Sequence, residues 1–199
     1  MNELDRIMEI IEAAGFSHTG KISMDTVELR DEVRDMCRNG NCGKYARNWS
    51  CPPGCGTLDQ CRQQLLSYKT GILVQTVGEI EDSMDWEGMK DTEERHKKTF
   101  LETAEKLRRA CPGFLPLGAG TCTLCGECTY PEKPCRQPER RISSMEAYGI
   151  LVSDICTRNQ VNIITVQKRS PIPPAISLIF LPDPSDKRTA SGKAAHLGP

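Results

Sequence analysis

The stretch FLPLGAGTCTLCGECTYPEKPCR, residues 114–136, runs from a short apolar segment directly into four closely spaced cysteines. The first part, FLPLGAG, is typical of a brief buried strand. The thiols follow at once with the spacing C-x2-C-x2-C-x6-C, as Cys122, Cys125, Cys128 and Cys135. A strand that ends in a loop dense with thiols predicts a folded domain whose loops hold a bound group.

The rest of the chain alternates helical and strand patterns. Helical patterns cover residues 3–14, 26–36 with Asp25 as N-cap, 61–69 and 86–111, and a further helix is expected to start at Ser143, where Ser143 and Glu146 have capping-box spacing. Strand patterns cover residues 16–23, 70–77, 161–167 and 175–181. We therefore predict an α/β or α+β fold, a mixed sheet with flanking helices and two cysteine-rich cluster-binding loops at 37–61 and 120–136. Residues 1–182 form the single domain, and 183–199, with little to bury, form a disordered tail.

Composition and charge limit the partners and the cellular compartment expected for this domain. The 199 residues include 26 Lys and Arg against 27 Asp and Glu, a balance that favours neither nucleic acid nor an anionic membrane as partner. No apolar run reaches the length of a membrane span, and the acidic N-terminus is not that of a signal peptide. A cytoplasmic location follows, and in that reducing compartment 11 cysteines indicate metal more than disulfides.

The four cysteines of 122–135, the second group, suit an iron–sulfur cluster. Bacterial ferredoxins use C-x2-C-x2-C-x3-C-P, in which short steps let successive thiolates reach different irons. Here the last gap is longer and Arg136 replaces the proline. Four thiolates also satisfy structural zinc, so zinc is the alternative to a [4Fe–4S] cluster.

A first group of cysteines lies upstream and is less regular. Its members are Cys37, Cys42, Cys51, Cys55 and Cys61, with gaps of four, eight, three and five residues. Four thiolates would complete a second [4Fe–4S] cluster, and we favour Cys37, Cys42, Cys51 and Cys61, with Cys55 as the fifth candidate. The only histidines, His18, His96 and His196, are distant in sequence, which argues against a Cys2His2 zinc site.

These blocks resemble a widespread family described as predicted metal-binding proteins. The similar elements are CRNGNCGKYARNWSCPPGCGTLDQC and the run from LGAGTCTLCGEC to SSMEAYGI. The resemblance implies a metal site that uses every cysteine of both groups except Cys55, and an anaerobic setting. It also implies a shared element containing Arg136, Pro138, Ser144, Met145, Glu146 and Gly149.

The expected function is that of a redox protein. Two clusters in a small domain would relay single electrons between a donor and an acceptor protein, and no P-loop or dinucleotide fingerprint supplies another cofactor. One alternative is a reductase or sulfur-handling enzyme that uses a cluster with an open site. Another is a structural zinc module that mediates protein binding.

Overall fold

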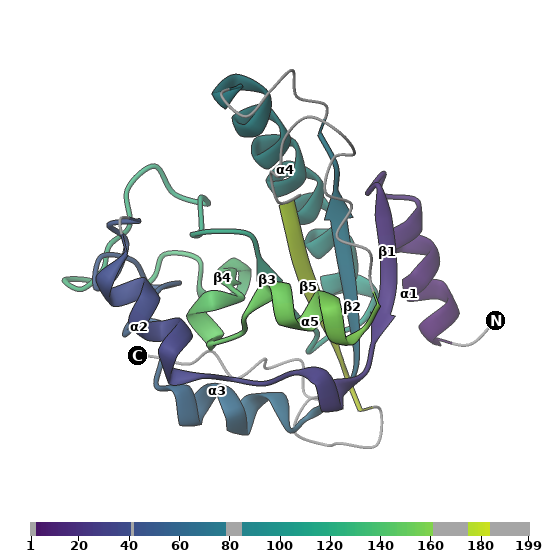
Figure 1. The fold of residues 1–199 in the computed structure, drawn as a ribbon, viewed down its shortest axis with the longest axis horizontal. Coiled ribbons are helices and arrows are strands. Elements are labelled where there is room, and N and C mark those ends of the chain that lie inside the picture. Colours follow the sequence, from purple (N-terminus) through teal and green to yellow (C-terminus); the bar gives the residue numbers. More distant parts are fainter. Residues whose placement is uncertain (1–2, 41, 79–84, 161–174, 184–199) are drawn as a thin grey trace.

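The computed structural model describes residues 3–40, 42–78, 85–160 and 175–183, and its centre is a five-stranded mixed sheet (Figure 1). The strands are β1 (His18–Ile22), β2 (Tyr68–Thr76), β3 (Leu115–Gly118), β4 (Ser143–Ser144) and β5 (Ala175–Pro182). Their order across the sheet is β1-β2-β5-β3-β4, and all neighbours are antiparallel except the parallel pair β3 and β4. The last strand in the described part of the sequence, β5, therefore lies in the middle of the sheet.

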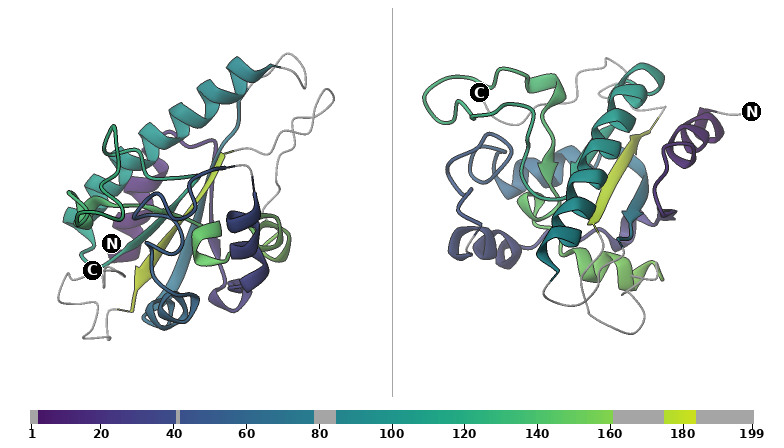
Figure 2. Two further views of the ribbon diagram at one scale, coloured as in Figure 1. Left: turned by 90° about the vertical axis from the view of Figure 1, so that its left-hand side faces the viewer. Right: turned by 90° about the horizontal axis from the view of Figure 1, so that it is seen from above.

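Helices cover both faces of this sheet (Figures 1 and 2). They are α1 (Glu3–Glu12), α2 (Asp31–Asn39), α3 (Leu58–Leu65), α4 (Trp86–Ala110) and α5 (Val152–Arg158), with short 3-10 turns η1 (Met24–Thr26), η2 (Pro138–Arg140) and η3 (Glu146–Tyr148). Side chains of α1 and α4 pack on one face, and those of α3, η3 and α5 pack on the other. The predicted fold class, a mixed sheet with flanking helices, is confirmed.

The continuous apolar run of β5 follows from its central position. Leu178 and Phe180 point into the core shared with α3 and α5, whereas Ile179 and Leu181 point into the core shared with α1 and α4. A strand that is buried on both faces needs apolar residues at every position, not at alternate ones. The predicted strands at 70–77 and 175–181 are confirmed for this reason.

Helix α4 matches the long helical pattern, and His96 fixes it to the sheet. The imidazole is buried, with Nδ1 2.8 Å from Oγ1 of Thr76 and Nε2 2.8 Å from Oγ of Ser177. Burial lowers the pKa of His96 to about 4, so the ring is neutral at pH 7. Trp86, the first residue of the helix, is exposed.

Two predicted helix starts are wrong because tertiary pairing overrides the local signal. Asp25 lies in η1, and α2 begins only at Asp31, after Leu29 has formed a bridge with Ile150. Ser143 lies in β4 beside Leu117, so it cannot cap a helix. The chain instead makes the turn η3, ends it at the left-handed Gly149, and starts α5 at Val152.

Both cysteine-bearing loops lie on the β4 side of the sheet, away from α1 (Figures 1 and 2). They are the first loop, residues 40–57, and the second loop, residues 119–137. The predicted strand at 161–167 and the tail from 184 lie outside the described residues. Among the residues that the structure describes, every helix is too short or too polar to cross a membrane.

Candidate metal centre

The second loop arranges its four cysteines around one pocket. This pocket has a volume of about 360 Å³ and is partly open to solvent. It is lined by all four thiol-bearing residues of the second group together with Asn48, Trp49, Leu124, Thr129, Arg136, Gln137 and Arg141. The structure therefore brings together all four predicted ligands of the second group.

Hydrogen bonds within the second loop hold it in shape without a regular element. Oγ1 of Thr129 donates to the carbonyl of Pro134 at 2.9 Å, and the amide of Lys133 donates to the carbonyl of Thr129 at 3.0 Å. Nη1 of Arg136 donates to the carbonyl of Glu127 at 2.8 Å. These contacts fold the long x6 gap into a compact turn, which lets Cys135 face the same pocket as the three regularly spaced cysteines.

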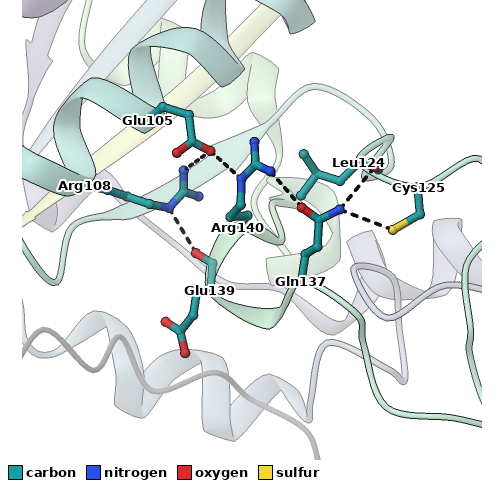
Figure 3. Close-up of polar contacts among 7 residues, drawn as sticks. All are labelled: Glu105, Arg108, Leu124, Cys125, Gln137, Glu139 and Arg140. Atoms are coloured by element: carbon teal, nitrogen blue, oxygen red, sulfur yellow. Dashed lines mark hydrogen bonds and ion pairs between the residues drawn. The ribbon is translucent and has the colours of Figure 1, made fainter.

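A polar chain connects the second loop to α4 (Figure 3). Nε2 of Gln137 lies 3.6 Å from Sγ of Cys125, and Oε1 of Gln137 accepts from Arg140 at 2.8 Å. Arg140 in turn donates to Oε1 of Glu105 at 2.6 Å, on helix α4. The contact with α4 thus positions the side-chain amide of Gln137 beside the sulfur of Cys125. N–H contacts to sulfur of this kind shift the reduction potential of iron–sulfur clusters.

The first group converges from two elements, the first loop and α2. The amide of Cys55 donates to the carbonyl of Cys51 at 3.0 Å, so these cysteines lie one turn apart. Nη2 of Arg34, on α2, donates to Sγ of Cys55 at 3.1 Å, and Cys37 follows Arg34 on the same helical face. Cys42 is exposed.

Burial raises the pKa of four thiols of the first group, those of Cys37, Cys51, Cys55 and Cys61. Burial raises the pKa of Cys37 to about 11, and the Glu146 carboxylate and neighbouring thiols raise it further. Burial also raises the pKa of Cys51, although hydrogen bonds from Thr121 and Ser50 oppose the rise. Because metals bind thiolates, loading of this group must release protons.

Cys61 occupies a different environment from the rest of its group. It lies in α3, is 0% exposed, and belongs to the core cluster that contains Leu65, Leu73 and Tyr148. Burial raises the pKa of its thiol to about 12. Cys111 and Cys156 are also buried in the two cores, where they pack as small apolar residues.

The two groups meet at residues 49–51. The amide of Trp49 lies 3.4 Å from Sγ of Cys128, and the amide of Cys122 donates to Oγ of Ser50 at 3.1 Å. Sγ of Cys51 and Oγ1 of Thr121 lie 3.4 Å apart, at hydrogen-bonding distance. A continuous set of short polar contacts therefore connects a cysteine of the first group with cysteines of the second.

The residue chemistry of both loops fits a thiolate-bound metal or cluster. Cysteine sulfur is the predominant potential metal ligand in these loops. N–H groups of Arg34, Trp49 and Gln137 point at sulfur atoms, as they do around thiolate-bound clusters. In the described ranges, no three side chains of His, Cys, Asp and Glu are arranged around a point where a single metal ion would sit. Arg34, Ser50 and Gln137 were not among the predicted site residues. Only Arg34 gave a sequence signal, as a cation one helical turn before Cys37.

A further pocket adjoins the second group on its α4 side. It has a volume of about 340 Å³ and includes Cys122 in its wall. Its other walls are His96, Lys97, Phe100 and Leu101 of α4, the segment 118–123 after β3, and Ile142 and Ser177. The pocket thus forms a partly open hollow beside a predicted ligand.

A mixed sheet with two thiol-rich loops that meet at one edge defines a cysteine-rich α+β protein of the kind that binds metal through sulfur. The chain belongs to the family described as predicted metal-binding protein (DUF2284), whose sequence profile matches residues 20–181. No curated protein and no solved structure gives a significant match. Membership in this family, expected from the two cysteine blocks, is confirmed, and metal binding is the property that the family carries.

Proposed function

We propose that the protein binds two [4Fe–4S] clusters, one in each cysteine group, and transfers single electrons between a donor and an acceptor protein. The observation that carries this proposal is the junction of the two groups at residues 49–51, where Trp49 contacts Cys128 and Cys51 contacts Thr121. A [4Fe–4S] cluster accepts and releases one electron at a time. Adjacent groups joined by short contacts suit a relay better than two unrelated structural sites.

The residues of the chain have separate tasks in this proposal. The thiolates hold the clusters, while Gln137 and the Trp49 amide direct positive dipoles at the sulfurs of the second group. Ser50 and Thr121 fix the spacing between the groups. Arg136 and Arg141 line the pocket of the second group, where positive charge offsets the negative charge of a thiolate-bound cluster.

Metal analysis after anaerobic purification tests the proposal. We expect about eight iron and eight sulfide per chain, broad absorption in the visible region, and little zinc. Reduction should change the visible absorption and give the electron paramagnetic resonance signal of reduced clusters. A colourless protein with bound zinc and no iron would instead support the structural zinc module, and it would exclude the relay.

A second candidate function is an enzyme, favoured by the pocket of about 340 Å³ beside Cys122. In this alternative, a reductase or sulfur-handling enzyme would bind its substrate there. The neutral His96 and the cation of Lys97 form part of the wall. Widening this pocket with Leu101→Ala would change turnover of a small-molecule substrate, whereas electron delivery to a protein acceptor would be unaffected.

A further inference from the structure

The first group contains five cysteines, one more than a cluster of the proposed kind needs from the protein. We infer that Cys55 is a metal ligand, together with Cys37, Cys42 and Cys51, that Arg34 is its charge partner, and that Cys61 is a packing residue of the core. This assignment rests on the proposed function in one respect only, the number of ligands. It differs from the set favoured in the sequence analysis, which has Cys61 in place of Cys55.

Cys61 lies on helix α3 and packs into the apolar core, not in the first loop. The side chain of Thr57 accepts from the amide of Gln60, and Gln60 returns the bond to the amide of Thr57, so a full capping box starts α3 at Leu58. The capped helix directs Leu58, Cys61 and Leu65 inward along one face. To reach a metal in the first loop, Cys61 would have to leave an apolar core in which it is fully buried.

Cys55 is connected to both elements that carry the other three members, the first loop and α2. Its amide donates to the carbonyl of Cys51 at 3.0 Å, which closes a turn of the first loop that contains both cysteines. Its sulfur accepts from Arg34, which is three residues before Cys37 and on the same face of α2. This contact ties Cys55 to the helix that carries Cys37.

Arg34 has the position expected of a cation that stabilises a bound thiolate. Its Nε donates to the carbonyl of Ala147 at 2.9 Å, and its Nη2 donates both to the carbonyl of Gly56 at 2.7 Å and to Sγ of Cys55 at 3.1 Å. The carbonyls of Ala147 and Gly56 fix the orientation of the guanidinium, and in this orientation Nη2 also points at the sulfur of Cys55. Hydrogen bonds to an ionised acceptor are about twice as strong as neutral ones, which suits a thiolate better than a thiol at this position.

Paired cysteine variants of the full chain test the ligand assignment. After anaerobic purification, Cys55→Ala should retain about half of the iron of the parent, whereas Cys61→Val, which keeps the core filled, should retain all of it. Circular dichroism verifies that each variant is folded. If folded Cys61→Val loses half of the iron, or if Cys55→Ala keeps all of it, the assignment is wrong. Should the parent contain zinc and no iron, the proposed function fails, but zinc content in the same two variants still decides between Cys55 and Cys61.

The reduction potential tests the role of Arg34. We expect Arg34→Gln to keep its iron but to lower the potential of one cluster, because reduction adds negative charge that the guanidinium no longer offsets. Arg38→Gln is the matched control, since Arg38 lies one turn further along α2 and contacts Asp35 and Tyr45 instead of a cysteine. Equal potentials in Arg34→Gln and the parent, measured by redox titration, would overturn this role.

Discussion

Replacing Trp49 with alanine is expected to accelerate release of the iron proposed for the second group by about 100-fold or more. Trp49 is 7% exposed and joins the two loops through three contacts, two of which are made by its indole. The indole Nε1 donates to the carbonyl of Lys133 at 2.9 Å, and the indole ring packs edge-on against Tyr130 with ring centroids 4.8 Å apart. The backbone amide of Trp49 lies against the sulfur of Cys128. Truncation of a buried Trp lowers stability by about 3–5 kcal/mol. Here the loss lowers the free energy of local opening of the second loop.

The measurement is the rate at which a chelator removes iron from the anaerobic protein. Trp49→Phe keeps a ring against Tyr130 but loses the indole N–H, so its rate should lie between those of the parent and Trp49→Ala. Trp86→Ala removes the only other tryptophan, which is exposed, and should leave the rate unchanged. A rate for Trp49→Ala equal to that of Trp86→Ala would show that Trp49 does not hold the second loop closed.

Gly149→Ala is expected to lower the free energy of unfolding by about 3 kcal/mol or more. Gly149 has φ +78°, and an added Cβ would lie 2.8 Å from the carbonyl oxygen of Arg30 and 2.8 Å from Cδ1 of Leu58. The backbone of Arg30 cannot move away easily, because its amide donates to the carbonyl of Gly149 at 2.8 Å. Both the left-handed conformation and the steric clash therefore oppose the substitution.

Gly15→Ala separates these two causes. Gly15 also has a positive φ, +90°, but an added Cβ there would meet nothing within 4 Å. The free energy of unfolding of Gly15→Ala should fall by only about 1–2 kcal/mol, which is the cost of the left-handed conformation alone. Urea denaturation of both variants under reducing, anaerobic conditions provides the comparison. Equal losses would mean that the contact of residue 149 with Arg30 contributes nothing.

Sequence patterns identified four of the five described strands, all except β4, but not which strands are neighbours in the sheet. The apolar runs at 70–77 and 175–181 predict buried strands, and both are present as β2 and β5. No local pattern states that β5 lies between β2 and β3, because strand order is decided by which apolar faces fit together over long sequence separations. The same long-range pairing of β4 with β3 explains why the capping-box signal at Ser143 is misleading.

In the candidate site, too, the sequence predicts some of the residues and not others. Spacing alone predicts the second group, and the structure places its four cysteines around one pocket. Spacing cannot choose between Cys55 and Cys61, although Thr57 and Gln60 carry the capping-box pattern that places Cys61 inside a helix. The contacts of Ser50 with Cys122 and of Gln137 with Cys125 join segments that no sequence motif relates, so they become visible only in the folded chain.

The central position of β5 has a consequence for biosynthesis. This strand is hydrogen-bonded to both β2 and β3, yet both cysteine groups precede it in the chain. During translation, the ribosome has delivered every predicted ligand before the strand that unites the two halves of the sheet emerges. These thiols are therefore exposed before their scaffold is complete, so a metal that meets the nascent chain would find them accessible but not yet organised.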